Sequence, residues 1–96
     1  MMEILEQAIK AVKLNLEPYD LKLLTRKKSY LCAKNQDDIL FVYIGKTKFL
    51  VKDALFLEKL AQQINTNNKY FFSITSLCSK AKNYLETKGF SIYVAL

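Results

Sequence analysis

The chain has 96 residues, of which 51% are hydrophobic and 25% are charged, a composition typical of one globular domain with a single core. It contains no histidine and two cysteines, Cys32 and Cys78, which excludes a cysteine–histidine nucleophile and the usual zinc sites. Lysine and arginine total 15 against 9 acidic residues, and the resulting formal charge of +6 favours polyanionic partners.

The beginning of the chain predicts a helix over residues 2–15, because apolar residues recur along one stripe with acids near the start and lysines near the end. Pro18 is expected to stop it. This N-terminus carries acids where a signal peptide needs positive charge, and no apolar run is long enough for a membrane span. We therefore expect a cytoplasmic protein that does not contact a membrane.

Strands are expected next, at 21–25 and 29–34, separated by the basic segment 26–28. The stretch DDILFVYIGKTKFLVKD (37–53) then predicts a hairpin: a strand at 39–44, a turn at Gly45-Lys46 and a returning strand at 47–51. The 39–44 run is apolar on both faces, which indicates a central strand covered on both sides.

The second half of the chain alternates helices with strands. Asp53 is a good N-cap for a helix reaching Ile64, and a strand follows at 70–74. A third helix, ending at Gly89, precedes a closing strand over 90–96. The sequence thus predicts one α/β domain over 1–96, with a mixed sheet flanked by helices and the order α-β-β-β-α-β-α-β.

The predicted hairpin brings Asp38 and Lys52 to neighbouring strand ends. This arrangement, after an N-terminal helix and an early strand, resembles the restriction-endonuclease-like fold with its PD-(D/E)xK motif. The resemblance implies that Asp38 is the metal-binding aspartate and Lys52 the lysine of Glu-x-Lys. The motif is degenerate, because Leu50 stands at the glutamate position and no proline precedes the aspartate. Glu58, on the following helix, would then supply the displaced carboxylate, and Asp53, next to Lys52, is the other candidate for it.

If the chain is active, the resemblance therefore implies a metal-dependent nuclease with catalytic Asp38, Lys52 and Glu58, in which Asp38 and Glu58 hold Mg²⁺ or Mn²⁺. Otherwise no cofactor is expected. Without a metal, Asp37 and Asp38 would be turn formers, Asp53 would cap a helix and Glu58 would be a solvated helix residue.

Basic residues offer a second kind of site. The residues that we expect to touch nucleic-acid phosphates, as positioning charges that do not read bases, are Arg26, Lys27, Lys28, Lys46, Lys48 and Lys52. All basic residues except Arg26 are lysines, and arginine is the residue that reads guanine edges bidentately.

The sequence leaves three functions open. The leading one is a non-catalytic binding or accessory domain on a degenerate restriction-endonuclease-like core, contacting the nucleic-acid backbone. The second is the metal-dependent nuclease. The third is a protein-interaction module that forms a homodimer through the terminal segment SIYVAL, which would leave an apolar edge if unpaired.

Overall fold

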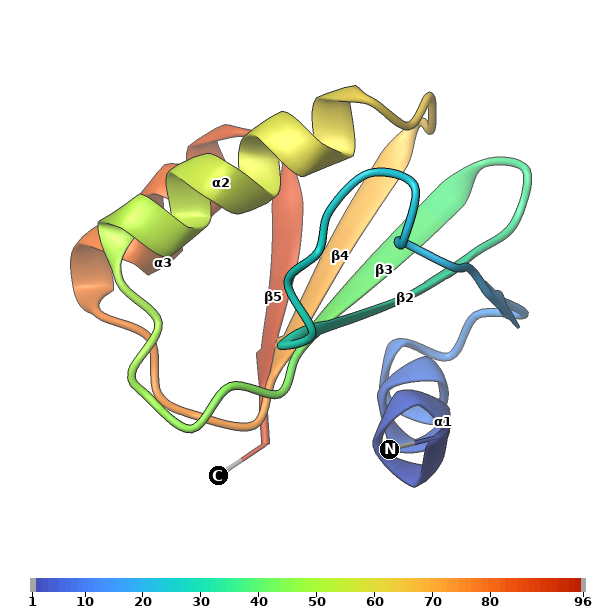
Figure 1. Ribbon diagram of the computed structural model, residues 1–96, viewed down its shortest axis with the longest axis horizontal. Helices are drawn as coiled ribbons and strands as arrows, with labels where there is room; N and C mark the ends of the chain where they lie inside the picture. Colours follow the sequence, from blue (N-terminus) through green and yellow to red (C-terminus); the bar gives the residue numbers. More distant parts are fainter. Residues whose placement is uncertain (1, 96) are drawn as a thin grey trace.

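The computed structural model describes residues 2–95, which form three helices and five strands (Figure 1). In chain order the elements are α1 (Met2–Val12), β1 (Glu17–Pro18), β2 (Tyr30–Lys34), β3 (Asp38–Tyr43), α2 (Val51–Gln62), β4 (Asn68–Ser73), α3 (Ser79–Thr87) and β5 (Phe90–Val94). Within this described part of the chain, no helix is long and apolar enough to cross a membrane.

The five strands form one mixed sheet in the order β1-β2-β3-β4-β5. Strands β1, β2 and β3 pair antiparallel, whereas β3, β4 and β5 pair parallel through the crossover helices α2 and α3. Because both parallel crossovers connect adjacent strands, their right-handed path puts both helices on one face. The predicted small α/β domain with a mixed, helix-flanked sheet is confirmed.

Helices lie on both faces of the sheet (Figure 1), and each face carries its own hydrophobic cluster. Helices α2 and α3 cover one face, where Phe41, Phe49 and Phe71 are fully buried. Helix α1 covers the other face, mainly over β2 and β3, through Leu5, Ala8 and Val12. Strand β3 lies in the middle and is buried from Ile39 to Tyr43, as its two-sided apolar run predicts.

The predicted hairpin at Gly45 is wrong. Residues 44–50 form a loop that leads from β3 to α2, and only Phe49 makes a β-bridge, with Leu77. The apolar pattern of 47–51 suggested a strand because Phe49 is fully buried, but this residue lies in a loop. Its ring packs between those of Tyr43 and Phe71, at centroid distances of 5.0 and 4.7 Å. Gly45 is needed for a different reason: a Cβ there would overlap the Tyr43 ring.

The predicted strand at 21–25 is also wrong. Leu24 and Thr25 both donate their N–H groups to the Leu21 carbonyl at 2.9 Å, which closes a helical turn. Asp20 reinforces it by accepting the Lys22 N–H at 2.9 Å. Such local side-chain bonds compete with strand formation. The first strand is instead the two-residue β1, whose Pro18 is tolerated because β1 is an edge strand.

Helix ends differ from the predictions in detail. Helix α1 ends at Val12, because Lys13 adopts a positive φ of 59°. Helix α2 begins at Val51 with Leu50 as N-cap, and Asp53 instead accepts the Leu50 N–H at 2.9 Å. Gly89 terminates α3 with a φ of 88°, as predicted. The closing strand ends at Val94, and Leu96 lies outside the described residues.

Candidate functional site

The carboxylate of Asp38 is engaged in structure. Asp38 is the first residue of β3, and its two oxygens accept amide hydrogens from Asn68 at 2.8 Å and from Asn35 at 3.1 Å. The neighbouring Asp37 accepts from the Asn67 amide at 3.2 Å. These bonds tie the β2–β3 turn to the start of β4, so both acids stabilise loops.

Lys52 and Glu58 lie away from Asp38. Strand β3 rises about 3.3 Å per residue, which puts its two ends about 17 Å apart, and Lys52 follows the end opposite to Asp38. Glu58, in the middle of α2, accepts a hydrogen bond from the Tyr84 hydroxyl at 3.2 Å. The structure therefore does not bring the three predicted catalytic residues together.

The described residues hold no other candidate metal centre. Within residues 2–95 there is no group of three or more histidine, cysteine, aspartate or glutamate residues placed to hold a metal ion. The residues present do not fit the magnesium or manganese site that the resemblance implies.

The carboxyl ends of the parallel strands, where open α/β sheets often bind ligands, are closed by loop contacts. Such sites open where adjacent crossovers diverge to opposite faces, whereas α2 and α3 lie on the same face. Loops 44–50 and 74–78 are moreover bonded to each other: Phe49 N–H donates to Ser76 O at 3.0 Å, and Cys78 N–H donates to Phe49 O at 3.0 Å. The Thr75 hydroxyl also donates to the Thr47 carbonyl at 3.2 Å.

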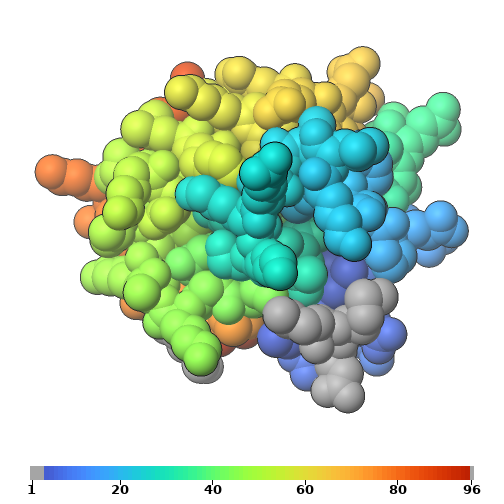
Figure 2. Space-filling model, in the orientation of Figure 1, coloured from blue at the N-terminus to red at the C-terminus, as the bar shows by residue number. Residues whose placement is uncertain are grey.

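A cavity of about 770 Å³ lies at the β1–β2 edge of the sheet. We call it the edge cavity. It exists because β1 covers only Ala33 and Lys34 of β2, after which the chain leaves the sheet through segment 19–29. Figure 2 shows this segment across the middle of the visible face. The cavity is lined by Leu5, Pro18, Tyr19, Asp20, Leu21, Lys22, Thr25, Arg26, Lys27, Lys28, Tyr30, Leu31 and Cys32.

The edge cavity combines an apolar floor with a basic rim. Leu5, Leu21 and Leu31 belong to the floor, whereas Lys22 and residues 26–28 are exposed around it. Four cations against the single carboxylate of Asp20 make the rim electropositive. Tyr19 is 39% exposed beside them, and the Lys34 ammonium lies 5.7 Å from its ring centre.

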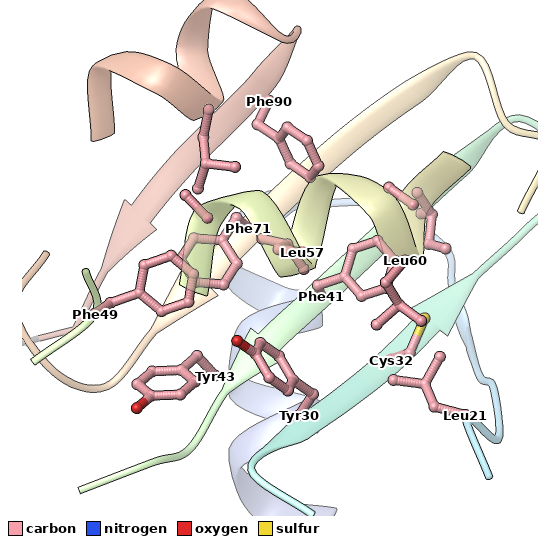
Figure 3. Close-up of a cluster of buried hydrophobic side chains, with 14 of the residues drawn as sticks. Leu21, Tyr30, Cys32, Phe41, Tyr43, Phe49, Leu57, Leu60, Phe71 and Phe90 are labelled. Atoms are coloured by element: carbon pink, nitrogen blue, oxygen red, sulfur yellow. The ribbon is translucent and has the colours of Figure 1, made fainter. Parts of the chain in front are cut away.

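Tyr30 and Cys32 form the inner wall of the edge cavity and belong to the core (Figure 3). The Tyr30 ring lies 5.4 Å from that of Tyr43 and 5.5 Å from that of Phe56. Its hydroxyl is buried with no hydrogen-bond partner among the described residues. Burial, with a smaller contribution from the Asp53 carboxylate, raises the pKa of Tyr30 above its ordinary value. Burial also raises the pKa of the Cys32 thiol to about 12. Both groups are therefore neutral at physiological pH, and the wall is uncharged.

The six predicted phosphate-contacting residues fall into two groups. Arg26, Lys27 and Lys28 lie on the rim of the edge cavity, as described above. Lys46 and Lys48 are exposed on loop 44–50 at the far end of β3, and Lys52 is exposed on the first turn of α2. The Lys27 ammonium lies 4.2 Å from the Phe56 ring centre and so fixes the rim against α2.

Sequence reasoning missed the edge cavity. Its position depends on segment 19–29 turning where a strand was expected. The signals present were Pro18, which is confined to edge strands, and the turn-forming Asp20. Comparisons of the chain with protein-family models, with curated proteins and with solved structures find no match.

Proposed function

We propose that this protein is a non-catalytic binding domain for single-stranded nucleic acid, with a nucleotide held in the edge cavity and the adjoining phosphates on its rim. One observation carries the proposal: an apolar cavity large enough for a nucleotide opens beside an exposed tyrosine and four basic side chains.

The chemistry of single-strand binding matches this combination. Proteins that bind single strands pair a basic surface along the backbone with aromatic rings on which bases stack, at about 1–3 kcal/mol per base. Tyr19 offers such a ring, and Arg26 and Lys28 are exposed positive charges on the rim beside it. The Lys27 ammonium is less available to a phosphate because it packs on the Phe56 ring.

An acidic peptide added to the edge of β2 is the rival ligand, and the structure favours it less. The Tyr19 N–H already donates to the Cys32 carbonyl at 2.8 Å, and β1 occupies the edge beyond it. Little of that edge is therefore available for a peptide strand, which needs a row of backbone groups.

A relation to a degenerate restriction-endonuclease-like core stays part of the proposal at the level of architecture alone. An N-terminal helix, antiparallel strands and a following β-α-β unit support it. The metal-dependent nuclease receives no such support, because Asp38 and Glu58 are held apart by their own hydrogen bonds.

Fluorescence anisotropy with a labelled single strand of about ten nucleotides tests the proposal, at salt concentrations from about 50 to 200 mM. The double change Arg26→Glu/Lys28→Glu should weaken binding by about tenfold or more. Loss of two phosphate contacts should also reduce the slope of log affinity against log salt by about 1.4. Tyr19→Ala should weaken binding by about 1–3 kcal/mol and leave that slope unchanged.

The matched control is Lys80→Glu/Lys82→Glu on α3, which alters the net charge equally at exposed sites far from the edge cavity. This control should retain most of the affinity. Equal losses of affinity in both double variants would mean that binding depends only on overall charge. That result would contradict the edge cavity as the binding site. Tighter binding of an acidic peptide of the same length than of the oligonucleotide would assign the site to a protein partner instead.

A further inference from the structure

The two edges of the sheet differ in how well they are protected. At one edge β1 is short, contains Pro18 and is followed by the covering segment 19–29. At the other edge β5 runs for five residues, Phe90–Val94, with no proline and no charged residue up to Ala95. Val94 is 40% exposed there. Natural proteins usually block such an edge with charge, proline or a bulge.

Alternate residues of β5 turn their backbone groups outward. The Ala95 N–H donates to the Ser73 carbonyl at 2.9 Å, which directs Ala95 toward β4. Because the direction alternates along a strand, Ser91 and Tyr93 also face β4, whereas Phe90, Ile92 and Val94 present their N–H and C=O groups to the free edge.

This free edge is complementary to itself. If two copies meet antiparallel about a two-fold axis through Ile92, Ile92 pairs with its own copy and Phe90 pairs with Val94. All three outward residues then exchange hydrogen bonds. On the other face Ser91 opposes Tyr93, so that two hydroxyl-bearing side chains meet across the axis.

We propose that β5 pairs with β5 of a second copy in this register, giving a two-fold dimer with one continuous sheet. A second copy fits this edge because it brings neither charge nor proline into the pairing and matches Phe90 with Val94 and Ser91 with Tyr93. Each copy carries a charge of +6, so the association is strengthened by salt. The edge cavity lies at the opposite edge of the sheet, and the inference does not rest on the proposed function.

Sedimentation equilibrium over a concentration series, at low and moderate salt, tests the dimer. The expected mass approaches twice the 11.1 kDa of one chain as concentration rises. Val94→Lys should raise the dissociation constant by about tenfold or more, because it places a lysine in each half of an apolar edge. The matched control is Leu55→Lys, which replaces a 43% exposed side chain on α2 and should not change the dissociation constant.

Amide hydrogen exchange resolved by residue adds a readout that does not depend on any variant. Protection of the Ile92 and Val94 amides should increase with protein concentration, whereas that of Tyr93 and Ala95, already bonded to β4, should not. A monomer at all concentrations up to about 1 mM would overturn the proposal. A dimer that Val94→Lys leaves intact would also overturn it. So would protection gained by a strand other than β5, whether in the dimer or on pairing with another protein.

Discussion

At the scale of single residues, burial decides what each side chain contributes. Tyr30 and Cys32 sit in the wall between the edge cavity and the core, where their ionised forms would be poorly solvated. Burial accordingly raises the pKa of both groups, that of Cys32 from 9.0 to about 12. Because these pKa values are raised on folding, the free energy of unfolding depends on pH in the alkaline range.

We expect the free energy of unfolding to fall as the pH rises above about 9. In the unfolded chain Cys32 and then Tyr30 lose their protons at their ordinary pKa values, whereas the folded chain keeps these protons to higher pH. Each group should contribute a slope approaching about 1.4 kcal/mol per pH unit, and neither should contribute below about pH 8. Urea unfolding across this pH range measures the decrease in unfolding free energy. Tyr30→Phe should remove the portion of that decrease that occurs above about pH 10. Stability that does not change up to about pH 11 would contradict this burial.

Phe49 should matter to stability as much as a strand residue does. Its ring is fully buried from a loop, against Tyr43 and Phe71. Phe49→Ala should therefore cost about 3–5 kcal/mol in unfolding free energy, similar to Phe41→Ala. Leu23→Ala, at a position that is 96% exposed, is the control and should change stability by less than about 0.5 kcal/mol. A Phe49 effect as small as that of the control would show that loop 44–50 does not complete the core.

At the scale of elements, the sequence predicts what periodicity and burial encode and misses what local bonds decide. Strand β3 and helices α1, α2 and α3 follow their apolar patterns, within a few residues at each end. Segments 21–25 and 47–51 also look like strands by composition. The first is instead a turn closed by local hydrogen bonds to the Leu21 carbonyl. The second is a loop anchored by Phe49, whose bridge partner Leu77 lies far along the chain and is not revealed by composition.

Hydrogen exchange should rank the elements by their position in the sheet. Amides of β3 and β4, which have a paired strand on both sides, should exchange slowest and report global unfolding. Amides of β1 and of segment 19–29 should exchange fastest, because β1 pairs through only two residues. Slow exchange at 21–25 comparable to that of β3 would mean that this segment is a strand after all.

At the scale of the whole molecule, the net charge suggests a class of partner to test but not where that partner would bind. The net charge of +6 and the cluster at 26–28 are visible in the sequence, and the rim of the edge cavity contains that cluster. The cavity itself depends on how far β1 extends along β2 and on how segment 19–29 returns. The predicted nuclease residues do not come together, because their meeting required a hairpin that the chain does not form.

The most direct measurement is an amide chemical-shift titration of the full chain with a short single-stranded oligonucleotide. Perturbations should concentrate in residues 18–32, around Tyr19, Arg26 and Lys28, and should weaken as salt rises. No perturbation at low salt, or one centred on α3 and its lysines, would contradict the claim that the edge cavity is the binding site.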